Sequence, residues 1–140
     1  MKEKYLVGID VGTTGAKTII FDNRGHIVGS GYKEYNCYYP KPNWVEQDVD
    51  MLIDAVFETN RQALEKSGIN PDEVVAIAAS TQRGCCIFVD YNNKPLKMIS
   101  WQDNRTIDEV TEIDQKLGSD EYYKITGMPN TPTWLLPKIL

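Results

Sequence analysis

The stretch Tyr5–Asp22, YLVGIDVGTTGAKTIIFD, limits what this chain can fold into more than any other part of the sequence. It predicts two strands joined by a glycine-rich turn, with Asp10 at the end of the first strand. Because glycine lets the backbone take positive φ and approach a ligand closely, the N–H groups of such a turn can form an anion-binding concavity. A carboxylate beside that concavity can hold Mg²⁺ directly or through water. The stretch therefore fits the phosphates of a nucleotide with Mg²⁺, and its spacing alone fits a plain β-hairpin equally well.

Composition argues against several classes of function. The net charge of -5 over 140 residues gives no basic surface for nucleic acid. No apolar run is long enough to cross a bilayer and no signal-peptide pattern is present, so we expect no membrane association. Three cysteines without metal-ligand spacing argue against a disulfide framework. A reducing, cytoplasmic location fits that pattern.

The order of predicted elements indicates an α/β fold with a mixed central sheet. Strands are expected over 4–10, 16–22 and 26–35 as an antiparallel meander, with a buried strand over 74–79 parallel to the first. Helices are expected over 49–67, 104–117 and 119–126, with a hairpin over 85–100 and a further helix beginning at 134. The final segment, WLLPKIL, is apolar, which predicts that the sequence belongs to a longer protein.

Apolar side chains at helical spacing define the face of the 49–67 helix that we expect on the sheet. They are Val49, Leu52, Ile53, Val56, Phe57, Ala63 and Leu64. Acidic residues near the start of this helix suit its dipole.

Two segments outside the helices carry candidate binding residues. Ser80–Gly84 follows the predicted buried strand, at the end where open α/β sheets bind ligands. The extended loop Asn36–Gln47 contains Tyr38, Tyr39 and Trp44. These aromatic residues either cover the edge of the sheet or line a cleft.

Three segments together resemble the N-terminal part of the FGGY family of carbohydrate kinases. They are GIDVGTTGAKTIIFD, the NWVEQD loop, and STQRG followed by WQDNRT. The resemblance runs from about Val7 to Lys138. It implies a ribonuclease H-like fold of the actin, hexokinase and heat-shock ATPase superfamily, with a mixed sheet and flanking helices, here as an incomplete domain. It also implies phosphoryl transfer from ATP, with Mg²⁺, to a hydroxyl of a sugar, sugar acid or polyol.

The resemblance implies a phosphate side formed by the first motif. Asp10 matches the acid that acts at the Mg²⁺ and phosphates, and is the one metal-binding and catalytic residue expected within this chain. The nucleotide-binding residues that the motif implies are Gly12, Thr13, Thr14, Gly15 and Lys17.

A sugar side is implied by the later motifs. Its residues are Gln82, Arg83, Trp101, Gln102, Asp103, Thr133 and Trp134. Other interpretations stay open at three positions. Arg83 could pair with an acid at a domain surface, and Trp101 could belong to the core. Asp103, with Arg105, is better suited to capping the following helix or bracing the loop than to touching substrate.

Departures from the family pattern bear on the substrate. Glycerol kinases carry Arg-Glu where this chain has Arg83-Gly84, and a tyrosine near Thr133. Xylulose kinases usually carry Met-His in the 82–84 region. The resemblance therefore argues against glycerol and favours a different sugar or sugar acid, with Gly84 leaving room for a larger substrate.

The family's general base is an aspartate in a later segment, and its adenosine pocket lies in a second domain. We therefore expect residues 1–140 to form the N-terminal part of the first kinase domain, inactive alone. The full-length enzyme is then expected to bind a small sugar or polyol, with a homodimer as one allowed assembly. The alternatives are a non-catalytic nucleotide- or sugar-binding regulatory domain of the same superfamily and a stand-alone interaction domain.

Overall fold

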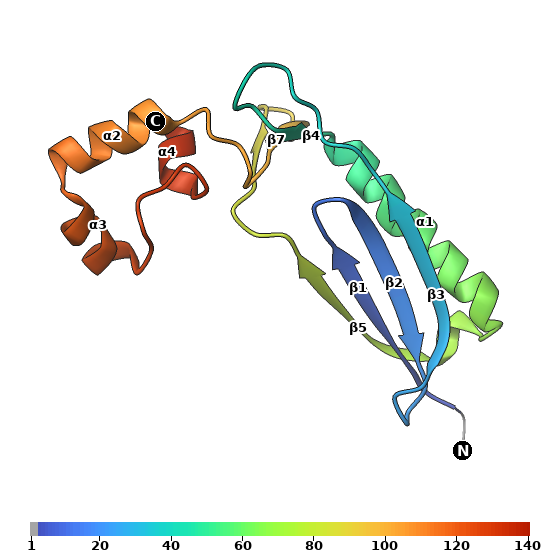
Figure 1. Cartoon of the computed structure of the whole chain (residues 1–140). Helices are drawn as coiled ribbons and strands as arrows, with labels where there is room; N and C mark the ends of the chain where they lie inside the picture. Colours follow the sequence, from blue (N-terminus) through green and yellow to red (C-terminus); the bar gives the residue numbers. More distant parts are fainter. Residues whose placement is uncertain (1–2) are drawn as a thin grey trace. The chain divides into compact units, whose positions relative to one another are not determined.

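The computed structural model describes residues 3–140 of the chain, which divide into two compact units. The first unit comprises the described residues up to Asn36 together with Val49–Gln82. The second unit comprises Cys37–Asp48 and Arg83–Leu140. Figure 1 labels the helices and strands of both, and each unit is described below by itself.

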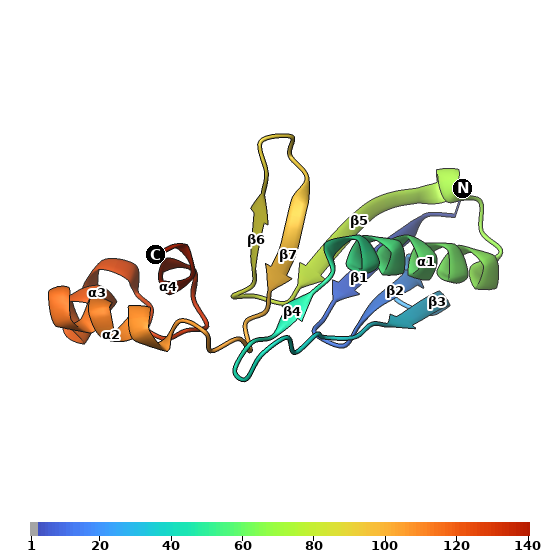
Figure 2. The same ribbon diagram turned by 90° about the horizontal axis from the view of Figure 1, so that it is seen from above.

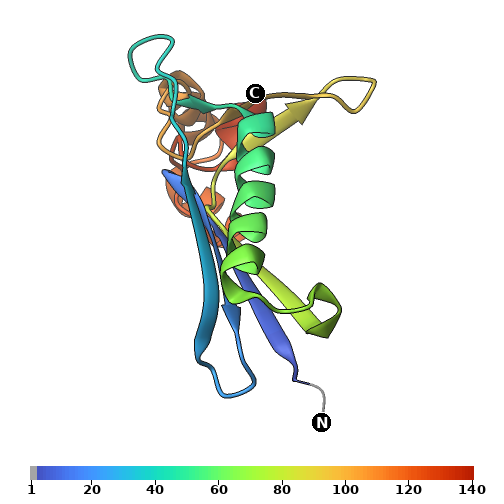
Figure 3. The same ribbon diagram turned by 90° about the vertical axis from the view of Figure 1, so that its right-hand side faces the viewer.

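The first unit is a four-stranded mixed sheet with one long helix on it. Its elements are β1 (Tyr5–Val11), β2 (Gly15–Phe21), β3 (Ile27–Glu34), α1 (Val49–Ser67), a 3₁₀ turn η1 (Pro71–Glu73) and β5 (Val74–Thr81). The strand order is β3-β2-β1-β5, with β1, β2 and β3 antiparallel and β5 parallel to β1. Figures 2 and 3 show α1 running along one face of this sheet. The predicted meander and the predicted parallel strand are both confirmed.

The turn between β2 and β3 is fixed by the side chain of Asp22. Its carboxylate accepts hydrogen bonds from the backbone N–H groups of Arg24, at 2.8 Å, and His26, at 2.9 Å. The bond from the His26 N–H is the main reason that the pKa of Asp22 lies below its usual range. Gly25 sits within this turn at a φ of 85°, a conformation that glycine adopts without strain.

Helix α1 approaches the sheet closely because β3 presents two glycines to it. A Cβ atom on Gly31 would lie 2.1 Å from the Thr59 carbonyl oxygen, and one on Gly29 would lie 2.3 Å from the Ala63 carbonyl oxygen. Neither distance is sterically allowed, so only glycine fits at these positions. Between α1 and β2, the hydroxyls of Thr59 and Thr18 form a buried hydrogen bond at 2.9 Å.

The buried face of α1 is narrower than the sequence pattern predicts. The buried residues are Leu52, Ala55, Thr59 and Ala63, a single stripe at helical spacing. Ile53 and Phe57 were expected to face the sheet, but their side chains are 50% and 70% exposed. Both lie to one side of the buried stripe.

The prediction that the 74–79 strand is buried is also wrong. Along β5 the side chains are mostly exposed, with Val75 at 55% and Ile77 at 65%. Within the first unit β5 pairs with β1 alone, so it forms an edge of the sheet. Helix α1 packs mainly on β3 and β2, toward the other edge of the sheet.

The second unit has a small antiparallel sheet and three helices. Its elements are β4 (Glu46–Gln47), β6 (Cys86–Val89), β7 (Pro95–Ile99), α2 (Ile107–Lys116), α3 (Ser119–Thr126) and α4 (Leu135–Ile139). The strand order is β4-β7-β6, and Figure 2 shows the predicted β6–β7 hairpin. Helix α2 contacts both α3 and α4. No disulfide joins the three cysteines, and no helix among the described residues is long and apolar enough to cross a membrane.

We expect Gly31→Ala to lower the stability of the first unit by about 1–3 kcal/mol, the usual cost of overpacking a well-packed interface. The added methyl group meets the backbone of α1, which can yield only by moving the helix. Urea unfolding followed by circular dichroism measures the change. Ser30→Ala on the same strand is the control, and an equal loss in both variants would contradict the account.

Candidate functional site

The turn between β1 and β2 is closed by its own backbone and anchored from β3. The N–H of Gly12 donates to the carbonyl of Gly15 at 3.0 Å. Tyr35, directly after β3, donates its hydroxyl to the Gly12 carbonyl at 2.6 Å and its N–H to the Thr14 carbonyl at 3.1 Å. These bonds hold the ends of the turn and leave the side chain of Thr14 exposed.

Sequence reasoning missed the role of Tyr35. The signal for it was the predicted meander, because the register of β2 and β3 pairs Gly15 with Glu34 and so places the next residue beside the turn. Tyr35 is 7% exposed, and a buried tyrosine hydroxyl needs a hydrogen-bond partner. The carbonyl of Gly12 supplies that partner.

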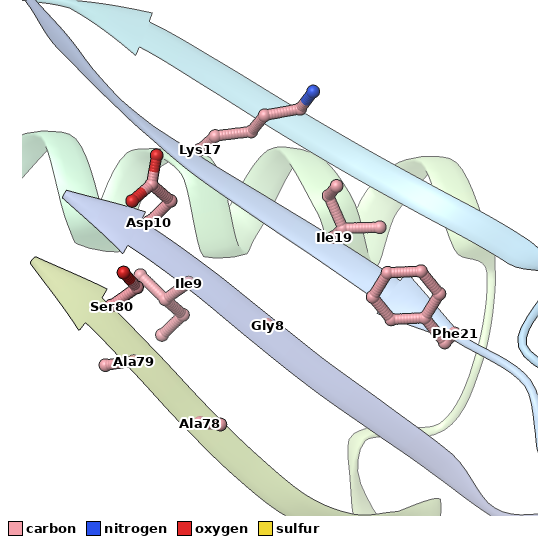
Figure 4. A pocket seen from close by; sticks show the side chains of 9 residues that line it. All are labelled: Gly8, Ile9, Asp10, Lys17, Ile19, Phe21, Ala78, Ala79 and Ser80. Carbon is pink, nitrogen blue, oxygen red and sulfur yellow. The ribbon is translucent and has the colours of Figure 1, made fainter. Parts of the chain in front are cut away.

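Asp10, Lys17 and Ser80 lie together on the sheet face opposite α1. The strand register pairs Asp10 with Lys17 on β2 and with Ser80 on β5. Figure 4 shows these three side chains grouped toward the end of β1. They border a hollow of about 350 Å³ on the open sheet face. Its lining residues are Gly8, Ile9, Asp10, Lys17, Ile19, Phe21, Ala78, Ala79 and Ser80.

The surroundings of Asp10 fit a Mg²⁺ ion that brings most of its own ligands. Asp10 is exposed, and no ion pair joins it to Lys17. A Cβ atom on Gly12 would lie 4.0 Å from the Oδ2 atom of Asp10, which places this turn residue directly beside the carboxylate. Among residues 3–140 no group of three or more metal-ligating side chains occurs. One carboxylate suits Mg²⁺, which keeps several waters and binds phosphate oxygens.

In the second unit, three segments implied on the sugar side meet at Gly84. A Cβ atom on Gly84 would lie 3.0 Å from the Thr133 carbonyl oxygen and 3.2 Å from the Cβ of Trp101. The φ of Gly84 is 75°, which side chains rarely adopt. Thr133 is half-buried at this contact, and the next residue, Trp134, is also half-buried. The expectation that Gly84 leaves room for a larger substrate is therefore wrong, because Thr133 and Trp101 already occupy that space.

The exposure of the remaining sugar-side residues narrows their interpretation. Trp101 is 39% exposed, so it is not a core residue. Arg83 and Gln102 are exposed, and no ion pair involves Arg83 in the part of the chain that the structure describes. Gln82 belongs to the first unit, where its N–H donates to the carbonyl of Val11 at 2.9 Å.

Asp103 is fully buried and braces the loop that carries Trp101. Its Oδ2 atom accepts the N–H of Val45 at 2.6 Å, and Arg105 donates Nε to Oδ1 at 2.9 Å and Nη2 to Oδ2 at 2.8 Å. Burial by itself would raise the pKa of Asp103, but the hydrogen bonds from Arg105 and from the Val45 N–H together outweigh it and hold that pKa below its usual range. Both oxygens are occupied, which favours the bracing interpretation over direct contact with substrate.

Arg105 connects this brace to the NWVEQD loop. Its Nη2 atom lies 2.8 Å from the Oε1 atom of Glu46, and its guanidinium lies 3.7 Å from the centre of the Trp44 ring. The backbone adds a bond from the Ser100 N–H to the Val45 carbonyl at 2.9 Å. The two sequence motifs NWVEQD and WQDNRT therefore fold against each other. The ring of Trp44 packs against the Arg105 guanidinium.

Comparison with known proteins identifies the family. Residues 5–140 match the model described as "FGGY family of carbohydrate kinases, N-terminal domain". The chain belongs to the FGGY family of carbohydrate kinases. It is 40% identical over 117 residues, 83% of its length, to a glycerol kinase of Thermococcus gammatolerans. It is 34% identical, over an alignment of 144 positions that covers 96% of its length, to a glycerol kinase of Sinorhizobium fredii.

Solved FGGY kinases share the fold of this chain. A gluconate kinase from Lactobacillus acidophilus matches 99% of the chain with a TM-score of 0.90 and 29% identity. A ligand-bound xylulose kinase from the same organism matches 97% with a TM-score of 0.89 and 30% identity. The predicted ribonuclease H-like fold class is thereby confirmed. The chain spans about a quarter of the length of these relatives, 24% to 29%.

We expect Arg105→Ala to destabilise the second unit by about 3 kcal/mol, because it leaves the buried Asp103 carboxylate without its ionic partner. Thermal unfolding measures this loss, with exposed Arg61→Ala, whose partners are Glu58 and Glu65, as the matched control.

The same variant has a predicted pH dependence. A lowered folded pKa makes ionised Asp103 stabilising above its unfolded pKa of about 3.9, and that stability is lost as pH falls through the folded pKa. The difference between wild type and Arg105→Ala should therefore shrink on acidification. A difference that stays constant down to acid pH would contradict this role for Asp103.

Proposed function

We propose that the protein containing this chain transfers the γ-phosphoryl group of ATP to a hydroxyl of a sugar, sugar acid or polyol. The observation that carries the proposal is an exposed carboxylate, Asp10, beside a glycine-closed turn in a chain of the FGGY family. Relatives named glycerol kinase and solved structures named gluconate kinase and xylulose kinase support it. These three acceptors define the range of substrates to be tested.

In this proposal the first unit handles the phosphates. The turn Gly12–Gly15 faces the phosphate oxygens in this proposal, with the exposed Thr14 hydroxyl as a donor, while the Gly12 N–H is used to close the turn itself. Asp10 would hold Mg²⁺ through its exposed carboxylate, and Lys17 offers a cation from the neighbouring strand. The metal ion, when bound, neutralises charge that develops on the transferred group.

The acceptor is bound mainly by the second unit. Arg83 and Gln102 are exposed donors for hydroxyl oxygens, and the partly exposed ring of Trp101 offers an apolar face to the C–H groups of a sugar. Gln82, Thr133 and Trp134 complete the set of proposed acceptor contacts. Asp103 acts through Arg105 and Val45, by fixing the loop on which Trp101 and Gln102 lie.

The reaction forms a bond from the acceptor oxygen to the γ-phosphorus and breaks the bond from that phosphorus to the bridging oxygen of ADP. The hydroxyl proton passes to a base, which the resemblance assigns to an aspartate beyond residue 140. The chain then corresponds to the N-terminal part of the first kinase domain, and positioning supplies most of the catalysis. Cytoplasmic location and a homodimer of the full-length enzyme stay predictions.

The test is ADP production by the full-length enzyme with Mg²⁺ and a panel of acceptors that includes glycerol, xylulose and gluconate. We expect at least one acceptor to stimulate ADP release well above the rate without acceptor. The isolated 140-residue chain, assayed in parallel, is expected to show no acceptor-dependent release. A full-length enzyme that no acceptor in the panel stimulates, or an active isolated chain, would contradict the proposal.

A further inference from the structure

Lys138 is a buried cation to which neither the phosphate-side motif nor the sugar-side motifs assign a role. It lies in α4, is 7% exposed, and donates from Nζ to the carbonyl oxygens of Thr133, at 2.7 Å, and Gly84, at 2.8 Å. Burial lowers its pKa, although the Asp103 carboxylate favours the charged form. Burying an ammonium group is costly unless hydrogen bonds compensate for it. A side chain with this cost is expected to contribute more than the filling of space.

The two carbonyls that Lys138 joins belong to segments far apart in the sequence. Gly84 directly follows Arg83, and Thr133 directly precedes Trp134. The single ammonium group therefore holds the backbone next to two proposed acceptor residues, Arg83 and Trp134. It does so through carbonyl groups, so the side chains of Arg83 and Trp134 stay available.

Contact at Gly84 extends this connection to Trp101. A Cβ atom added at Gly84 would lie 3.1 Å from the Thr133 methyl carbon and 3.2 Å from the Trp101 Cβ, closer than ordinary contact with either neighbour. Gly84 is therefore packed closely between Thr133 and Trp101. The bond from Lys138 holds the Gly84 carbonyl in place.

We propose that Lys138 is a positioning residue of the acceptor pocket, which ties the Arg83–Gly84 turn and the Thr133 loop together against Trp101. The inference rests on the proposed function. A lysine with a purely structural role would stabilise the second unit without any preference between the two substrates. A positioning role predicts an effect on the acceptor alone, because every segment that Lys138 holds is on the acceptor side.

The experiment compares Lys138→Met with wild type in the full-length enzyme, using the best acceptor from the panel. We expect the acceptor KM to rise about tenfold or more while the KM for ATP stays within about twofold, since small displacements of binding groups cost large factors. Lys124→Met is the matched control, because Lys124 also lies in a helix of this unit but is 71% exposed. It should change neither constant.

Gly84→Ala is a second route to the same pocket. Its added methyl group presses on Thr133 and Trp101 and should also raise the acceptor KM selectively. If Lys138→Met does not fold, this variant decides. Unchanged acceptor KM, or equal rises in both KM values, would overturn the inference while wild-type activity leaves the proposed function intact. A wild-type enzyme that phosphorylates no acceptor would instead remove the proposed function, and this inference with it.

Discussion

The carboxylate of Asp103 has no solvent exposure, and the second unit is assembled around its neutralisation by Arg105. A buried charge without a partner costs several kcal/mol, so the loop that carries Asp103 must bring Arg105 and the Val45 N–H to it. Arg105 in turn reaches Glu46 and stacks on Trp44. Two motifs more than fifty residues apart in the sequence are thereby joined, and these bonds hold the loop that carries Trp101.

The first unit achieves rigidity by a different means, which is close backbone approach. Glycines on β3 let α1 lie directly on the sheet, and Tyr35 ties the end of β3 to the turn that follows β1. The turn is consequently fixed from outside, while the Asp10 carboxylate beside it stays open to solvent. This combination of a fixed backbone and an open carboxylate is what phosphoryl transfer requires, because its catalysis depends on positioning and charge neutralisation.

Local patterns predicted the turns, most helix limits and every strand except the short β4, which was expected to be part of an extended loop and pairs with the distant β7. The errors share one cause, which is that burial depends on what lies across from a residue. Ile77 reads as a core residue and is exposed because β5 is an edge strand. Gly84 is predicted to leave space for substrate, but it packs closely against Thr133 and Trp101. These neighbours are distant from Gly84 in the sequence, so the local pattern does not show the contact. The hydrogen bond from Lys138 to the Gly84 carbonyl joins residues far apart in the sequence and no local pattern reveals it, whereas the place of Tyr35 beside the turn follows from the register of the predicted meander.

The division of labour between a phosphate side and an acceptor side is the central claim of this account. It is tested most directly by steady-state kinetics of Asp10→Ala and Arg83→Ala in the full-length enzyme. Asp10→Ala should lower kcat by a large factor with little change in the acceptor KM, and Arg83→Ala should mainly raise the acceptor KM. The reverse pattern, in which Asp10→Ala raises the acceptor KM and Arg83→Ala lowers kcat alone, would contradict it.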